Sequence, residues 1–305
     1  MNIFGSGKGV DPEKLARDEA SRESIARGGL PLNAIDRLTE EAQRNRDGKP
    51  FFTSDLSPNE LLLTRQCGFE PLGQVMGSTI YHVGLVSNST MGWAWFTGEI
   101  TVLSEARTHA RQLAFSRLQQ EAKLLGADGV VGVRFTRQES NVGPSMIEFM
   151  AVGTAVRRIS DGTVAPPVLE PFVSNLSGQD HWALRQAGSA PLGFVFGTCA
   201  WFQLMDWRGQ SAMTSWRNME ITSATQGLYT AREIAMERLM HETRLLHAEG
   251  VVGVDFENHI QVIEAGENQT GGFILQCTAY GTAIGADPVP FRKSHQIANF
   301  ISLRD

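Results

Sequence analysis

ARQLAFSRLQQEAKLLGADGVVGVRF, residues 110–135, returns at residues 231–256 as AREIAMERLMHETRLLHAEGVVGVDF, and about 15 of the 26 aligned positions are identical. A repeat of this length indicates that one structural unit occurs twice in the chain. In each copy, apolar residues at helical spacing lead into a glycine-bounded, valine-rich segment that is typical of a buried strand. The repeat therefore predicts two modules with the same fold.

The similarity extends to both sides of this stretch. PLGQVMGS at 71–78 matches PLGFVFGT at 191–198, and each copy closes with an apolar segment, MIEFMAVGTAV in the first and GFILQCTAYGTAI in the second. These segments are rich in β-branched and aromatic residues and are predicted to be strands. We expect the long helices between them to run from about Ser104 to Leu125 and from about Ala224 to Leu246.

A short helix precedes the first strand of each copy. Ser57 and Glu60 form a capping box in the first copy, and Ser177 and Asp180 take the same places in the second. The fold class is therefore predicted to be α+β, with two tandem β-α-β-β modules, each with a short lead-in helix, after a helical N-terminal extension. Each module is expected to form a three-stranded sheet covered on one face by its long helix.

These patterns divide the chain into five segments. Residues 1–52 form a helical or partly disordered N-terminal extension, 53–157 the first module, 158–172 a proline-containing linker, 173–286 the second module and 287–305 a C-terminal tail. The extension and the tail are candidate docking surfaces for a protein partner. A three-stranded sheet also leaves free edges, so we expect a homo-oligomer.

Composition excludes several classes of protein. The net charge of -6, without a basic stripe, argues against nucleic-acid binding. No apolar run approaches the ~20 residues of a membrane span, and the N-terminus lacks the pattern of a signal peptide. Cys67, Cys199 and Cys277 cannot all pair and show no metal-ligand spacing, so the expected location is a reducing cytoplasm.

With the order of elements established, the long helix followed by LGADGVVGVRF and a strand ending in GTAV resembles the YbjQ-like family, whose members carry a heavy-metal-binding label. The second copy is similar through YTAREIAMERLMHETRLLHAEGVVGVDF and AYGTAI. The two matches cover roughly residues 70–157 and 190–286. The resemblance implies a dodecin-like fold and, because single-module members form pentameric rings, a pentamer-like ring. It implies no particular set of metal ligands.

Ionisable residues kept in both copies are the first candidates for a site. Two pairs are spaced i,i+4 on the long helices, and one further arginine recurs near the start of each: Arg117 with Glu121, Arg238 with Glu242, and Arg111 with Arg232. We interpret the pairs as salt bridges on a helix surface or a subunit interface, in preference to catalytic acids. No serine, cysteine or histidine is shared in a catalytic arrangement, which favours a non-enzymatic protein.

Metal binding depends on less regular features. His241 and His247 are the weak candidates for ligands, but six positions separate them, so they point to different sides of a helix. The first copy has Gln120 and Gly126 in their places, which excludes a repeated site. A bound metal ion of unspecified identity is kept as an alternative.

Aromatic residues gather between the first strand and the long helix of each copy, namely Trp93 and Trp95 in one and Trp207 and Trp216 in the other. They are expected to fill an interface core or to line a pocket for a planar ligand. The sequence therefore favours a non-enzymatic oligomeric scaffold or binding module. The alternative is a protein that binds or sequesters a small ligand or a heavy metal at subunit junctions.

Overall fold

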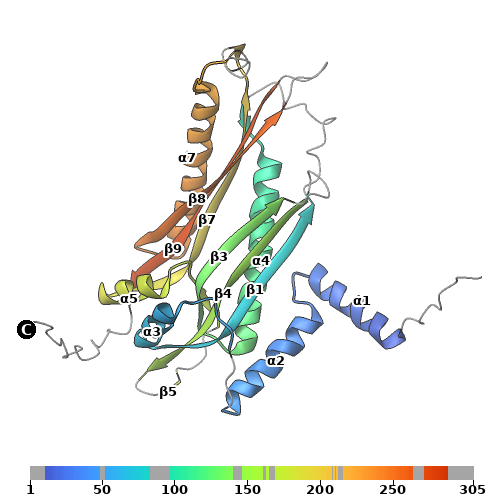
Figure 1. Ribbon diagram of the computed structural model, residues 1–305, viewed down its shortest axis with the longest axis vertical. Coiled ribbons are helices and arrows are strands. Elements are labelled where there is room, and N and C mark those ends of the chain that lie inside the picture. Colours follow the sequence, from blue (N-terminus) through green and yellow to red (C-terminus); the bar gives the residue numbers. More distant parts are fainter. Residues whose placement is uncertain are drawn as a thin grey trace, which may run out of the picture.

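The computed structural model describes residues 11–48, 52–82, 97–139, 146–160, 163–164, 169–207, 209, 211, 216–263 and 271–287 (Figure 1). It confirms the predicted α+β class and the order of elements in both modules. The C-terminal tail beyond Asp287 and the middle of the linker lie outside these residues.

The first module is built around four long elements. Helix α3 (Pro58–Gln66) leads into β1 (Phe69–His82), and α4 (Thr101–Leu125) is followed by β3 (Gly129–Glu139) and β4 (Met146–Ser160). The strands form an antiparallel sheet in the order β1-β4-β3, with β1 at an edge. The short β5 (Thr163–Val164) pairs with the end of β4.

The second module repeats this plan. Helix α5 (Gly178–Gln186) precedes β7 (Ser189–Leu204), and α7 (Thr222–Leu245) is followed by β8 (Gly250–Ile263) and β9 (Gly272–Ala286). Its sheet has the order β7-β9-β8, again antiparallel. The predicted capping boxes are present at the starts of both α3 and α5.

The two modules exchange strands. The short β2 (Gly98–Glu99), just before α4, pairs with β7 of the second sheet, while β6 (Phe172–Val173), just before α5, pairs with β3 of the first sheet. Phe115 and Phe135 of the first module stack on Phe194 of the second, with ring centroids 5.0 and 4.9 Å from it. The two modules therefore pack together through shared strands and a common aromatic cluster, and they are not independent domains.

Glycine allows each long helix to lie against its first strand. A Cβ atom on Gly77 would lie 1.9 Å from the carbonyl oxygen of Ala114 on α4, and one on Gly197 would lie 2.0 Å from that of Ala235 on α7. The backbone of each helix therefore packs directly on the backbone of the first strand, at a distance that any side chain larger than that of glycine would prevent. The small residues that sequence periodicity placed on the helix stripe serve this close approach.

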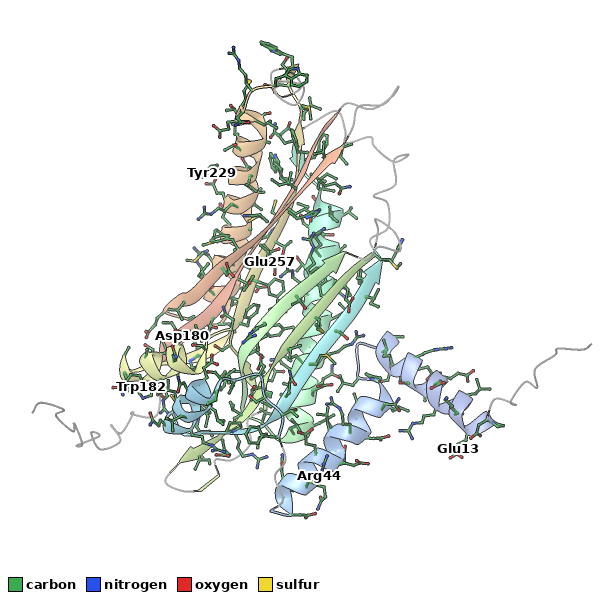
Figure 2. All side chains as sticks on the ribbon, in the orientation of Figure 1. Glu13, Arg44, Asp180, Trp182, Tyr229 and Glu257 are labelled. Carbon is green, nitrogen blue, oxygen red and sulfur yellow. The ribbon has the colours of Figure 1, made fainter. Side chains whose placement is uncertain are left out.

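The N-terminal extension forms two helices, α1 (Pro12–Ala26) and α2 (Leu32–Arg46). Leu38 and Ala42 of α2 are buried in the core that contains Leu118 and Ala122 of α4. No residue of α1 is buried, and this helix projects away from both sheets, with Glu13 at its far end (Figure 2). The extension is thus anchored by its second helix.

Within the part of the chain that the structure describes, no helix is long and apolar enough to cross a membrane. The three cysteines are free and buried. Burial raises the pKa of the Cys199 thiol to about 12 and that of Cys67 and Cys277 to about 11. All three thiols are therefore held in the unreactive protonated form.

Candidate functional site at the junction of the modules

The repeated arginine and glutamate residues bind the edge of the first strand in each module. Nη1 of Arg117 donates to the carbonyl oxygen of Ser78 at 2.6 Å, and the carboxylate of Glu121 accepts from the backbone N–H of Met76 at 2.8 Å. In the second module Arg238 donates to Thr198 at 2.5 Å and Glu242 accepts from Phe196 at 3.0 Å.

In the described structure Arg117 and Glu121 form no salt bridge with each other, and neither do Arg238 and Glu242. The ion pairs of these side chains in the described structure lead elsewhere, from Glu121 to Arg37 and from Arg238 to Glu99. The physical reason is that β1 and β7 are first strands whose outer backbone groups are covered by a helix and must still be hydrogen-bonded. Each side-chain pair satisfies one carbonyl and one N–H on either side of the packing glycine.

Burial has an electrostatic effect on this arrangement. It raises the pKa of Glu121 and of Glu242 above the ordinary value, while the N–H groups of Met76 and Phe196 act in the opposite direction. Burial likewise lowers the pKa of Arg117. These shifts follow from the burial of side chains that bind the backbone of the edge strand, so they are not evidence of acid-base catalysis.

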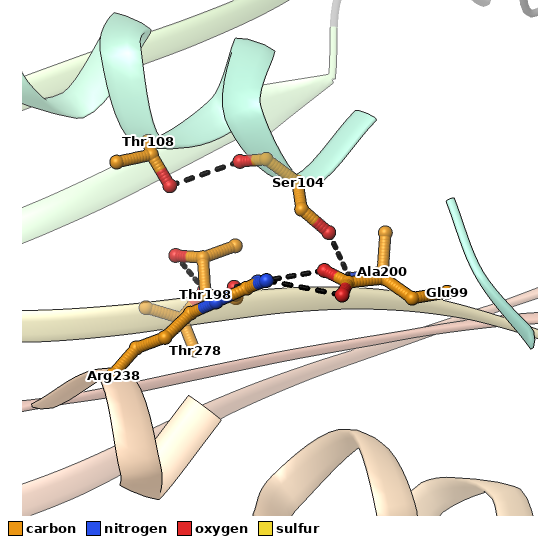
Figure 3. A network of polar contacts seen from close by, with 7 residues as sticks. All are labelled: Glu99, Ser104, Thr108, Thr198, Ala200, Arg238 and Thr278. Atoms are coloured by element: carbon orange, nitrogen blue, oxygen red, sulfur yellow. Dashed lines mark hydrogen bonds and ion pairs between the residues drawn. The ribbon is translucent and has the colours of Figure 1, made fainter. Parts of the chain in front are cut away.

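The outer partners of the two arginines differ. The guanidinium of Arg238 forms a bidentate contact with the carboxylate of Glu99, at 2.7 and 3.0 Å, across the module boundary (Figure 3). The remaining donors of Arg117, Nη2 and Nε, reach the carbonyl oxygens of Ile25 and Gly29, at 3.1 and 3.2 Å, near the end of α1. One arginine thus binds the neighbouring module, and the other binds the N-terminal extension.

The start of α4 completes the edge of the second sheet. The backbone N–H of Ala200 donates to Oγ of Ser104 at 2.9 Å (Figure 3). The carbonyl oxygen of Ala200 accepts from the backbone N–H of Ile100 at 2.7 Å. Leu103, Ala110 and Ala114 of α4 share a core with Ala200, Phe202 and Ile274 of the second sheet. This part of the junction combines β-strand pairing with apolar packing.

The remaining repeated arginine also behaves differently in the two modules. Arg111 is buried, forms a 2.6 Å ion pair with Glu257 of β8, and lies 4.8 Å from the ring centroid of Phe149. Figure 2 shows Glu257 between the two modules. Burial lowers the pKa of Arg111, and Glu257 raises it. Arg232 instead is exposed and stacks over Phe256 of its own module, with its guanidinium carbon 4.5 Å from the ring centroid.

An open groove of about 530 Å³ lies where α4 faces α7 and β7. Glu105 and His109 on α4, and Glu237 and His241 on α7, are among the residues that line it. Each pair is spaced i,i+4 and therefore shares one face of its helix. Imidazole and carboxylate groups suit a divalent transition metal or a small cation. No three such side chains among the described residues are close enough to hold one ion.

Sequence comparison between the repeats missed Glu105, His109 and Glu237 because the groove joins positions that are not equivalent in the two modules. The signal that could have found them is the i,i+4 spacing within each helix. His241, one of the two predicted metal candidates, lines the groove, whereas the exposed His247 follows the end of α7. His247 takes a positive φ of 51° there, where the first module has Gly126.

The structure describes only two of the four tryptophans that the sequence singled out. Trp93 and Trp95 lie outside the described residues, and Trp207 and Trp216 are exposed. The aromatic side chains that the structure places at the junction include Phe115, Phe135, Phe194 and Tyr280. Tryptophan content alone could not distinguish an exposed loop from an interface.

The fold and the repeated strand-binding residues define a tandem protein of β-α-β-β modules, and family comparison agrees. Residues 68–158 and 190–287 match the YbjQ family, which is described as "Putative heavy-metal-binding". The matches cover more than half of the chain, which therefore belongs to this family.

The relatives include proteins with two different descriptions. The chain is 40% identical over 246 residues, 80% of its length, to an encapsulin nanocompartment protein of Mycobacterium tuberculosis, 92% of which is covered. It is 42% identical over 89 residues to a UPF0145 protein of Halorubrum lacusprofundi, and 38% identical over 89 residues to one of Pseudothermotoga lettingae. Each of these two matches covers 29% of this chain, and 84% and 82% of the relative respectively.

Proposed function

We propose that this protein is a non-enzymatic scaffold whose chains assemble in the cytoplasm into a homo-oligomer through repeated module junctions. One observation carries the proposal, namely the unequal burial of two helices of the same design. Eleven residues of α4 are buried but only five of α7, because α4 contacts both sheets and helix α2 of the extension, whereas α7 contacts its own sheet. A helix with one covered face leaves an incomplete interface.

The chemistry at the module junction supports the same proposal. The arginine and glutamate residues that occur in both copies bind backbone groups, and the core of the junction is apolar. Neither the hydrogen bonds nor the apolar core requires a substrate. A relative named as an encapsulin nanocompartment protein is consistent with assembly as the role of such a chain. Buried free thiols suit a reducing compartment.

The experiment is native mass spectrometry together with sedimentation velocity on the full chain at micromolar concentration. The expected mass is a whole multiple, greater than one, of the 33.4 kDa chain. Because an apolar interface is insensitive to ionic strength, the oligomer is expected to persist in high salt. A single species with the mass of one chain in both measurements would contradict the proposal.

The groove favours a second candidate function, the binding of a divalent metal ion or a small cation at the module junction. Glu105, His109, Glu237 and His241 bring carboxylate and imidazole groups to the two sides of one open space. All four residues are exposed, so their side chains can change rotamer and converge on an ion that enters between the helices.

Isothermal titration calorimetry of tag-free protein with Zn²⁺ tests this candidate. The wild type is expected to bind Zn²⁺ with at most one site per groove, and the double variant His109→Ala with His241→Ala is expected to lose that heat. His247→Ala is the matched control, since His247 is an exposed histidine that does not line the groove. Absence of binding by the wild type, or equal binding by all three proteins, would eliminate this candidate.

A further inference from the structure

We infer that a second copy of this chain docks head to tail on the first, with its α7 and the outer edge of its β8 against residues 52–56 and β1 of the first copy. This arrangement repeats, between chains, the junction that the two modules form within one chain. The inference rests on the proposed scaffold function and specifies the partner, the two surfaces and the polarity of the contact.

The internal junction shows how the backbone pairs. The segment that leads into the second module runs along β3 of the first, where Gly132 N–H donates to Leu176 at 3.0 Å and Val133 N–H donates to Ser174 at 3.0 Å. Ser174 N–H donates in return to Val130 at 2.9 Å. Gly132 has a φ of 64°, and this bulge turns its N–H away from β4 and toward the added segment.

The two partners of this pairing, a bulged strand and a lead-in segment, each occur a second time in the chain without a partner. The bulged strand is β8, and the lead-in segment is residues 52–56. Gly253 of β8 corresponds to Gly132, has a φ of 61° and sits in the same bulge. Among the described residues, the N–H groups of Gly253 and Val254 have no backbone partner of the kind that Gly132 and Val133 have. β8 is correspondingly an outer strand of its sheet, whereas β3 is paired on both sides.

The complementary segment is already in position on the first module. Oγ of Ser54 lies 2.9 Å from Oγ1 of Thr154, as Oγ of Ser174 lies 3.0 Å from Oγ1 of Thr282 in the second module. Each serine therefore fixes its lead-in segment on its own module in the same way. The carbonyl oxygens of Ser54 and Leu56 correspond to those of Ser174 and Leu176, which accept the hydrogen bonds at the internal junction.

Apolar burial at equivalent positions identifies the faces that a second copy would cover. Ala200 of β7 is 0% exposed at the internal junction, whereas its counterpart Ile80 on β1 is 71% exposed. Val133 of β3 is 3% exposed, whereas its counterpart Val254 on β8 is 40% exposed. The surfaces buried inside the chain thus have exposed and still apolar counterparts at its ends, a pattern that marks an interaction surface.

The N-terminal extension changes one part of the repeated junction. The outer donors of Arg117 already bind Ile25 and Gly29, so the ion pair that Arg238 makes with Glu99 has no equivalent at the open end. The extension nevertheless leaves Ile80 exposed and does not contact residues 52–56 by any described hydrogen bond. Backbone pairing and apolar contact therefore hold the second copy, without the arginine–carboxylate contact.

The test uses Ile80→Asp and Val254→Asp in the full chain. Both side chains are exposed within one chain, so each variant is expected to fold with the wild-type circular dichroism spectrum and thermal midpoint. Each is expected to sediment as a monomer, because a buried carboxylate would face an apolar partner. Leu169→Asp is the matched control, since Leu169 is 94% exposed and lies on neither face, and it should keep the wild-type mass.

Mixing the two variants gives the decisive result. Ile80→Asp retains an intact β8 face and Val254→Asp retains an intact β1 face, so an isotope-labelled mixture should form a dimer with one chain of each kind and grow no further. If either variant alone keeps the wild-type mass, the inferred faces are wrong even though the scaffold function stands. A monomeric wild type would overturn both the inference and the scaffold proposal.

Discussion

Gly197→Ala is expected to lower the free energy of unfolding by at least about 3 kcal/mol, the upper range for overpacking a core, and the thermal midpoint by roughly 10 °C. The added Cβ would lie 2.0 Å from the carbonyl oxygen of Ala235 and 2.6 Å from the backbone nitrogen of Leu239. Both atoms belong to the helix backbone, so no change of rotamer relieves the clash. Moving α7 outward would also stretch the bond from Phe196 to Glu242.

Differential scanning calorimetry on the variant and on Gly250→Ala measures this effect. Gly250 begins β8 in the same module, and nothing lies within 4 Å of a Cβ built on it, so this control should unfold within a few degrees of the wild type. An equal, small effect of both substitutions would show that α7 does not pack on β7 through backbone.

His181→Phe is expected to remove the loss of stability that protonation of His181 causes in the wild type between pH 6.5 and pH 4. His181 on α5 is buried beside Phe69 and Phe172, and neither ring nitrogen has a hydrogen-bond partner in the described part of the chain. Burial lowers its pKa from 6.5 to about 4, while the nearby Asp180 acts in the opposite direction.

The sign follows from proton binding. Between these two pKa values the unfolded chain binds a proton at His181, whereas the folded chain does not. The free energy of unfolding therefore falls as the pH falls through this window. At 1.36 kcal/mol for each pKa unit, the loss is on the order of 3 kcal/mol. Phenylalanine fits between the same rings without a titrating group.

Urea unfolding of the wild type, His181→Phe and His241→Gln at a series of pH values separates this contribution from the others. His241 is an exposed histidine, so its replacement controls for the loss of one imidazole. The difference in free energy of unfolding between wild type and His181→Phe should change across the window. A pH-independent difference would show that His181 is solvated in solution.

Much of the fold could be predicted because local patterns and tertiary packing agree. The capping boxes at Ser57 and Ser177 lie where the sequence placed them, and the strands after each GVVGV motif are found in the expected order. The helix boundaries differ slightly, since α4 begins at Thr101, where the sequence suggested about Ser104. Pairing of β2 with β7 organises this first turn, and no local pattern encodes a partner so distant in sequence.

The site was predictable only in part, for two physical reasons. The i,i+4 spacing of Arg117 and Glu121 suits a salt bridge along the helix as well as two bonds to a strand, and only the position of β1 decides between them. The groove was hidden by the repeat itself. His109 and Glu237 line the same groove although they occupy positions that are not equivalent in the two modules, so residues shared by both copies do not include them.

The exchange of strands between modules limits the number of modules that a closed ring can contain. Each chain contributes two modules that are joined by one internal junction. A ring closed through the inferred faces therefore contains an even number of modules, and a five-module ring cannot be built from whole chains. Its junctions alternate between two kinds, within and between chains, and the groove lined by His109 and His241 belongs to the first kind alone. A ligand that binds there would accordingly saturate at one equivalent per chain, half the number of modules.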